Sequence, residues 1–332
     1  MIGGEFEIDL SIQREFVPQP DTYYYASGRT ALYQIMRSLG PQHTKVWMPD
    51  WLCHTMVEAA DRAKTEVVFY ELNSDFKATL EALDKSGFRD GDSVLMVNYF
   101  GLQDLTLTAK EIKDAYPQAV VIEDDVQAYW SFYEKENPYA DYRFTSLRKA
   151  FAIPDGGLVK TKRPMPEVKR PNTFAPLKIE AGVMKLHRGE DGIRDEDYLA
   201  LFKQGDVLIS DNYDSCMSDE SKRLFAGTDF ETIKRQRQAN AKFIVDGLKK
   251  KGMKPMIEMV SDCVPLFIPV VLNNRNEVRR RLFQHEIFCP VHWPLEGMDV
   301  KRGRMMAETE LSLIIDQRYG QKEMEEIIDL LQ

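Results

Sequence analysis

The chain has 332 residues and a formal net charge of −9, with 43% hydrophobic and 29% charged residues. This length allows one large or two medium domains with a buried core, and the acidic charge argues against a nucleic-acid-binding surface. The longest apolar run, Val264 to Leu272, is too short to span a bilayer and contains two prolines.

The cysteines and the first residues bear on the cellular compartment. Cys53, Cys216, Cys263 and Cys289 are scattered without CxxC spacing, which favours reduced thiols over a disulfide framework or a zinc site. Residues 1–7 have neither the basic start nor the apolar core of a signal peptide. We therefore expect a cytoplasmic protein without a metal site.

In the first half of the chain, the predicted helices and strands alternate. Residues 1–22 are polar and indicate an N-terminal arm, and apolar residues at helical spacing after Ala26–Thr30 predict a helix that ends at Gly40. The next predicted strands are Val46–Met48, Val67–Tyr70, Val94–Tyr99 and Ala119–Ile122, with helices at Thr55–Ala63 and Thr108–Ala115. This alternation predicts βαβ units and a mainly parallel sheet, in which ligands bind at the carboxyl ends of the strands.

The second half of the chain is expected to add a peripheral region and a smaller domain. A strand at Leu158–Thr161 precedes residues 162–225, which we place outside the sheet. Further predicted elements are helices at Ala175–His187, Phe230–Lys251, Asn276–His285 and Lys322–Leu331, and strands at Cys263–Leu272 and Phe288–Trp293. The predicted fold class is α/β, with a large domain at residues 1–230 and a small α+β domain at residues 231–332.

Lys149 is the first candidate for a chemical role. It lies in the mixed polar and apolar run Phe144–Gly157, three residues after Ser146 and before a glycine pair. Most lysines are solvated surface residues, whereas a sheltered lysine needs a partner or a function. The run alone does not decide between the two.

Two further stretches also have two interpretations each. The acids Glu123–Asp125 directly follow the strand at Ala119–Ile122. They form either a solvated loop or a site where one carboxylate pairs with a cation or metal. Ser27–Thr30 opens a helix, either as an ordinary N-cap or as a phosphate site in which Gly28 permits close approach and Arg29 adds donors. Together, a phosphate cradle, a carboxylate at a strand end and a sheltered lysine are the parts that hold pyridoxal phosphate.

Several motifs resemble those of the DegT/StrS-type sugar aminotransferases, which have the aspartate-aminotransferase fold, fold type I of the enzymes that use pyridoxal phosphate. The similar segments are Ser27–Leu32, Ile122–Ala128 and Phe144–Gly157, joined by Val97–Gly101, Pro290–Pro294 and Asp316–Gly320. They occur in the family's order and cover nearly the whole chain.

The resemblance implies a role for each matching position. Lys149 would form a Schiff base with the cofactor and move the substrate proton, while Asp124 would pair with the pyridine nitrogen. Gln127 would contact the side of the ring that carries the phenolic oxygen. The implied phosphate-binding residues are Gly28, Arg29, Thr30 and Ser146.

Other positions depart from the family pattern. Cys53, flanked by Trp51 and His54, stands where the family stacks an aromatic residue on the ring, so Cys53 and His54 are candidate cofactor contacts. Arg29 stands where the family often has threonine, and Ala152–Asp155 replaces a glycine-rich segment. His292 would lie near the substrate mouth or would have a structural role.

The resemblance implies a homodimeric, cytoplasmic aminotransferase that uses pyridoxal phosphate. It would transfer an amino group from glutamate to a keto group of a nucleotide-linked sugar, as in polysaccharide or amino-sugar biosynthesis, without binding nucleic acid or membranes. One alternative is a sugar dehydratase or eliminase with the same cofactor. A dehydratase of this family is expected to have lost the lysine at the position of Lys149. The other alternative is a non-catalytic binding or regulatory protein, which would not need Lys149, Asp124 and a phosphate cradle together.

Overall fold

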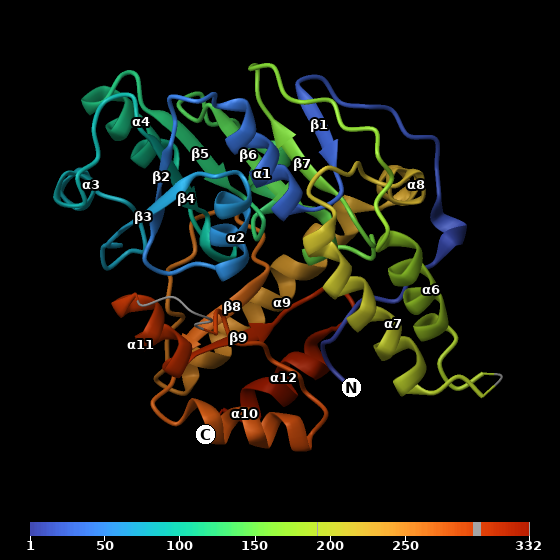
Figure 1. Cartoon of the computed structure of the whole chain (residues 1–332). Helices are drawn as coiled ribbons and strands as arrows, with labels where there is room; N and C mark the ends of the chain where they lie inside the picture. Colours follow the sequence, from blue (N-terminus) through green and yellow to red (C-terminus); the bar gives the residue numbers. More distant parts are fainter. Residues whose placement is uncertain (191, 295–299, 332) are drawn as a thin grey trace.

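A seven-stranded sheet forms the larger part of the computed structural model, which describes residues 1–190, 192–294 and 300–331 (Figure 1). Its strand order is β1-β7-β6-β5-β4-β2-β3. The strands are β1 (Thr22–Tyr25), β2 (Lys45–Pro49), β3 (Glu66–Tyr70), β4 (Ser93–Val97), β5 (Val120–Asp124), β6 (Tyr142–Ser146) and β7 (Gly157–Lys160). Strands β2 to β6 run parallel to one another, whereas β7 is antiparallel to its two neighbours, β6 and β1. The predicted α/β class with a mainly parallel sheet is confirmed.

Helices on the sheet explain why its central strands are buried. Every residue of β4, β5 and β6 is buried, as expected for a sheet covered on both faces. The helices of this part are α1 (Gly28–Ser38), α2 (His54–Arg62), α3 (Leu80–Lys85), α4 (Thr106–Ala115) and α5 (Tyr129–Glu134). Helix α1 packs against β6 and β7, and α5 packs against β6. The N-terminus of α1 is thereby held beside the carboxyl end of β6.

Residues 162–225 lie outside the sheet, as predicted. They include α6 (Ala175–Leu186), α7 (Asp195–Leu208) and most of α8 (Asp219–Gly227), and in the described residues they contribute no strand to the seven-stranded sheet. Helices α6 and α7 pack side by side (Figure 1).

A second, two-stranded sheet lies in the C-terminal third of the chain. It pairs β8 (Phe267–Val271) antiparallel with β9 (Glu310–Ile314), and α12 packs on α9 (Figure 1). The helices of this part are α9 (Phe230–Lys250), α10 (Arg275–Gln284), α11 (Lys301–Thr309) and α12 (Gln321–Asp329). The predicted strand at Phe288–Trp293 is wrong, because β9 takes the place beside β8, and Pro290 has no N–H to give to a ladder.

The first residues of the N-terminal arm are anchored at two points. Ile2 forms a parallel bridge with Ile287, and the Ile8 N–H donates to the Gly182 carbonyl of α6 at 3.0 Å. The chain therefore starts against the C-terminal third, near α12 (Figure 1), and reaches the large sheet only at β1.

Candidate active site

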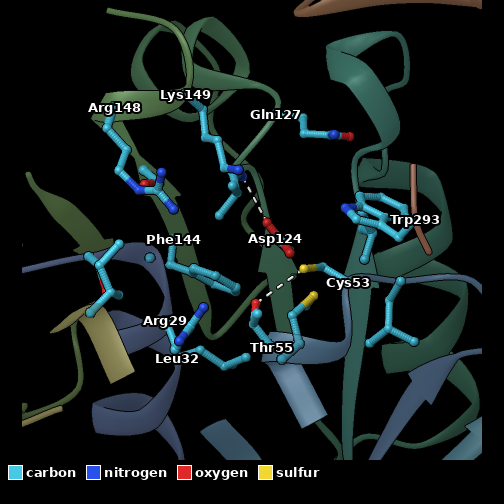
Figure 2. A pocket seen from close by; sticks show the side chains of 18 residues that line it. Arg29, Leu32, Cys53, Thr55, Asp124, Gln127, Phe144, Arg148, Lys149 and Trp293 are labelled. Carbon is cyan, nitrogen blue, oxygen red and sulfur yellow. Dashed lines mark hydrogen bonds between the residues drawn. The ribbon is translucent and has the colours of Figure 1, made fainter. Parts of the chain in front are cut away.

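A cavity of about 180 Å³ opens at the carboxyl ends of β4, β5 and β6, beside the N-terminus of α1 (Figure 2). It lies at the edge of the sheet where ligands of parallel sheets bind. Among the residues singled out from the sequence, it is lined by Gly28, Arg29, Cys53, Asp124, Gln127, Ser146 and Lys149. Thr30, His54 and His292 do not line it.

Asp124 lies in the cavity because of its place at the end of β5. Successive side chains of a strand point to opposite faces, so Asp124 lies on the face of its sheet neighbour Phe144, whose ring also lines the cavity. Glu123 and Asp125 lie on the other face, where both are ion-paired with Arg143, at 3.4 and 2.6 Å. One acid of the three is thus left for a ligand, while the other two neutralise a buried cation.

The buried Asp124 carboxyl has an unusual protonation equilibrium. Burial raises its pKa to about 7, although the N–H of Val126 donates to its Oδ1 at 2.7 Å and opposes the shift. A cation or a protonated ring nitrogen beside this group would favour its charged form.

Lys149 ends the short 3₁₀ helix η3 (Leu147–Lys149), which directly follows β6. Figure 2 shows Lys149 and Arg148 side by side, both pointing into the cavity, with Asp124 facing Lys149. The Arg148 guanidinium lowers the pKa of Lys149 to about 8, and burial acts in the same direction. A large fraction of Lys149 is therefore the nucleophilic neutral amine near pH 8. Lys149 is exposed to solvent and lines the cavity, so the sheltered position expected from the sequence is not complete in the chain alone.

The N-terminus of α1 combines an N-cap with an opening toward the cavity. Ser27 Oγ accepts from the Thr30 N–H at 3.1 Å, and the Thr30 hydroxyl donates to the Asn212 carbonyl at 3.1 Å. The Thr30 side chain is therefore committed to the fold. The first N–H groups of a helix have no partner within it, and Gly28 brings them to the cavity wall.

Arg29 reaches the cavity from the first turn of α1. Its Nη1 lies 3.5 Å from Glu58 Oε2 and donates to the Ser210 hydroxyl. His54 Nε2 lies 2.9 Å from the other Glu58 oxygen. Glu58 therefore links His54 to Arg29, and His54 itself does not line the cavity.

Gln127 and Cys53 line other parts of the cavity wall. The Phe100 N–H donates to Gln127 Oε1 at 2.9 Å, which fixes the amide group and keeps its Nε2 as a donor. Cys53 Sγ lies 3.2 Å from Thr55 Oγ1, a contact shown by a dashed line in Figure 2. Cys53 precedes α2 and offers only a thiol where a ring would stack.

Trp293, not His292, lines the cavity. His292 lies behind it, where His292 Nδ1 is 2.8 Å from Ser312 Oγ and its backbone N–H donates to Glu310 Oε2 at 2.6 Å. Burial lowers the pKa of His292 to about 3, so its ring is neutral and anchors the loop. Trp293 and Phe144 were missed as wall residues, although both stand within the family-like segments read from the sequence.

The described residues hold no group of three or more histidine, cysteine, aspartate or glutamate side chains arranged to bind a metal. Within the same residues, no helix combines the length and the apolar character needed to cross a membrane.

No protein-family model matches the chain, and no curated protein matches it by sequence. Solved structures do match. The S. venezuelae DesV structure, in complex with a ketimine intermediate, is 19% identical, with a TM-score of 0.65 over 93% of this chain and 83% of that chain. The putative sugar aminotransferase Spr1654 from Streptococcus pneumoniae, in its PMP form, is 16% identical, with a TM-score of 0.69 over 98% and 90%.

A DegT DnrJ EryC1 StrS aminotransferase from Brucella abortus is 15% identical, with a TM-score of 0.61 over 95% of this chain and 90% of that chain. The match extends along almost the whole length of both chains, so it includes both the large and the small sheet. The chain therefore has the fold of these aminotransferases.

Proposed function

We propose that the chain is an aminotransferase that uses pyridoxal phosphate. The observation that carries the proposal is the meeting of Lys149, Asp124 and the N-terminus of α1 in one cavity. These are an amine for the aldehyde, a carboxylate for the ring nitrogen and donors for the phosphate. The fold shared with sugar aminotransferases in PLP and PMP forms supports the same conclusion.

The residues at one end of the cavity fit the phosphate of the cofactor. A Cβ on Gly28 would lie 3.1 Å from Ser146 Cβ and 3.1 Å from Val126 Cγ2, closer than ordinary packing. Glycine therefore lets the N-terminus of α1 lie close to Ser146 and Val126 at the cavity wall, where backbone N–H groups and the helix dipole favour an anion. Arg29 and the Ser146 hydroxyl add donors from two sides.

When bound, pyridoxal phosphate supplies an aldehyde that takes up amines and a ring that accepts electrons. Asp124 is the carboxylate that would pair with the ring nitrogen and favour its protonated state. Lys149, as the neutral amine, takes the proton from the substrate carbon and returns one to the product. Trp293 and Phe144 contribute apolar surface to the wall of this cavity.

The finer proposals follow the resemblance of the motifs to the DegT/StrS type. The amino donor is glutamate and the acceptor is a keto sugar linked to a nucleotide, as in polysaccharide biosynthesis. The protein acts in the cytoplasm as a homodimer. Residues 1–230 form the domain that binds the cofactor, including the arm at 1–22, and residues 231–332 form the small domain.

The test is to convert the protein to its pyridoxamine form and to add a panel of nucleotide-linked keto sugars. An aminotransferase returns to the aldehyde absorbance with a keto sugar and produces an amino sugar. A dehydratase would release a deoxygenated sugar without forming an amino sugar. The presence of Lys149 favours the first outcome.

A further inference from the structure

A second cavity of about 390 Å³ adjoins the first, and Arg148 and Lys149 line both. The remainder of its wall includes the N-terminal residues Gly3 to Phe6, Phe267 and Pro290. A molecule that reacts at Lys149 can therefore extend from the first cavity into the second.

The second cavity carries more positive than negative side chains. Arg148, Lys149, Arg237 and Arg318 line it, against Glu5 and Asp316. Arg237 is 1% exposed and donates to backbone carbonyls and to Gln317, with no carboxylate within ion-pair distance in the described part of the chain. Arg318 is neutralised by Asp316 at 2.8 Å. The excess positive charge favours an anionic ligand.

Among the described side chains that line the second cavity, Arg148 has a buried donor without a hydrogen-bond partner. Its Nε is buried and has no hydrogen-bond partner in the described structure. Its ion pair with Asp206 is long, at 3.8 Å, and Asp206 lies closer to Lys178, at 2.9 Å. A guanidinium has five N–H donors in a fork that matches a carboxylate. Arg148 is therefore held beside Lys149 with its fork largely unpaired.

We propose that Arg148 binds the α-carboxylate of the amino donor and that the second cavity holds the remainder of that donor. The inference rests on the aminotransferase function proposed above. In an α-amino acid the carboxylate is bonded directly to the carbon that carries the amino group. An α-amino group that reacts at Lys149 thus places its carboxylate within reach of the neighbouring residue, Arg148.

A diphosphate is the other anion that a substrate of this enzyme carries. In a nucleotide-linked sugar, the diphosphate is separated from the reacting keto carbon by the sugar ring. It therefore extends away from Lys149 instead of lying beside it. This separation favours the donor carboxylate as the partner of Arg148.

The Glu5 carboxylate is expected to lower the affinity of this site for anions. This carboxylate lines the cavity, acts on the charge of Lys149 and forms no hydrogen bond or ion pair with described residues. A like charge beside the bound carboxylate weakens its binding. Replacement of Glu5 by glutamine is therefore expected to tighten it.

The test measures binding of glutarate, an unreactive dicarboxylate, by calorimetry on protein loaded with pyridoxamine phosphate. Arg148→Gln is expected to weaken binding by roughly tenfold to a hundredfold, as for a lost charge-assisted hydrogen bond, and Arg148→Lys by less. Glu5→Gln should bind more tightly than the wild type. The matched control is Arg194→Gln, an exposed arginine paired with Glu196 and Asp197, which should bind like the wild type.

A second readout isolates the α-carboxylate. L-glutamate and 4-aminobutyrate differ only in that group, so Arg148→Gln should lose most of the wild-type preference for L-glutamate in single-turnover conversion of the aldehyde form. Unchanged glutarate affinity and unchanged preference in a folded Arg148→Gln protein overturn the proposal. Weaker binding of UDP by Arg148→Gln, with unchanged binding of glutarate, would also overturn the proposal. A wild type that does not retain the cofactor would instead refute the proposed function.

Discussion

Asp124 and Asp125 are consecutive in the chain but serve opposite faces of the sheet. Asp124 lines the cavity at the end of β5, whereas Asp125 accepts from Arg143 at 2.6 Å and from the Asn98 amide at 3.2 Å. The pair therefore separates a group that is available for chemistry from one that holds the fold together.

Asp124→Asn is expected to reduce turnover by on the order of a hundredfold or more, because an amide cannot hold the ring nitrogen in its protonated state. The loss should appear in single-turnover spectra of protein saturated with cofactor. Turnover equal to wild type would show that Asp124 is not the partner of the ring.

The same substitution should stabilise the cofactor-free protein at high pH. The folded pKa of Asp124, about 7, lies above its unfolded value, so the native state loses stability as the pH rises from about 4 to 7. The amide introduced by Asp124→Asn does not titrate, so the melting temperature of this variant should exceed that of the wild type at pH 8, with little difference at pH 4. The reverse order would contradict the buried, ligand-free environment assigned to Asp124.

Asp125→Ala is expected to act on the fold. It removes the closer carboxylate from buried Arg143 and leaves Glu123 at 3.4 Å as the remaining partner. Loss of one member of a buried pair costs about 3–5 kcal/mol when the remaining charge has no partner, so a smaller loss is expected here, because Glu123 remains, and urea unfolding can measure it. A variant as stable as the wild type would show that the network adds no stability.

Arg29→Ala should weaken cofactor binding through the phosphate alone. Wild-type protein is expected to bind pyridoxal phosphate more tightly than pyridoxal, and the variant should lose roughly tenfold of this preference. Equilibrium dialysis with both ligands makes the comparison. Equal losses for both would place Arg29 in a structural role through Glu58 and Ser210.

Capture of pyridoxal phosphate by cofactor-free protein should depend on the ionisation of Lys149. Only the neutral amine attacks the aldehyde, and the pKa of Lys149 is lowered to about 8 chiefly by Arg148. The capture rate should therefore rise with pH through about 8. In Arg148→Gln the midpoint should move upward, because the neighbouring positive charge is gone. An unmoved midpoint, with Arg194→Gln as the control, would contradict this origin of the shift.

Much of the large sheet could be predicted from the sequence because its strands are short apolar runs separated by helical periodicity. Strands β2 to β5 lie within two residues of the predicted bounds. Strand β9 could not be predicted, since its place beside β8 depends on contacts across residues far apart in the chain. The proline-containing run at Phe288–Trp293 has the composition of a strand but no ladder partner among the described residues.

In the candidate site, the motifs located the residues that line the cavity but not the direction of each side chain. Thr30 and His54 stand beside cavity residues in sequence, yet Thr30 donates to the Asn212 carbonyl and His54 pairs with the partly exposed Glu58, outside the cavity wall. His292 and Trp293 are neighbours, and only the packing of the loop decides which one lines the cavity. Tertiary contacts determine which of these side chains line the cavity, and the local sequence pattern does not predict them.

The most direct test of the account is reduction of the purified protein with borohydride after incubation with pyridoxal phosphate. The protein should be yellow before reduction and should lose this colour on reduction. Peptide mapping should then find the reduced cofactor attached to Lys149, while Lys149→Ala should bind the cofactor without covalent attachment. A colourless protein that ignores added pyridoxal phosphate, or attachment at another lysine, would contradict the proposed site.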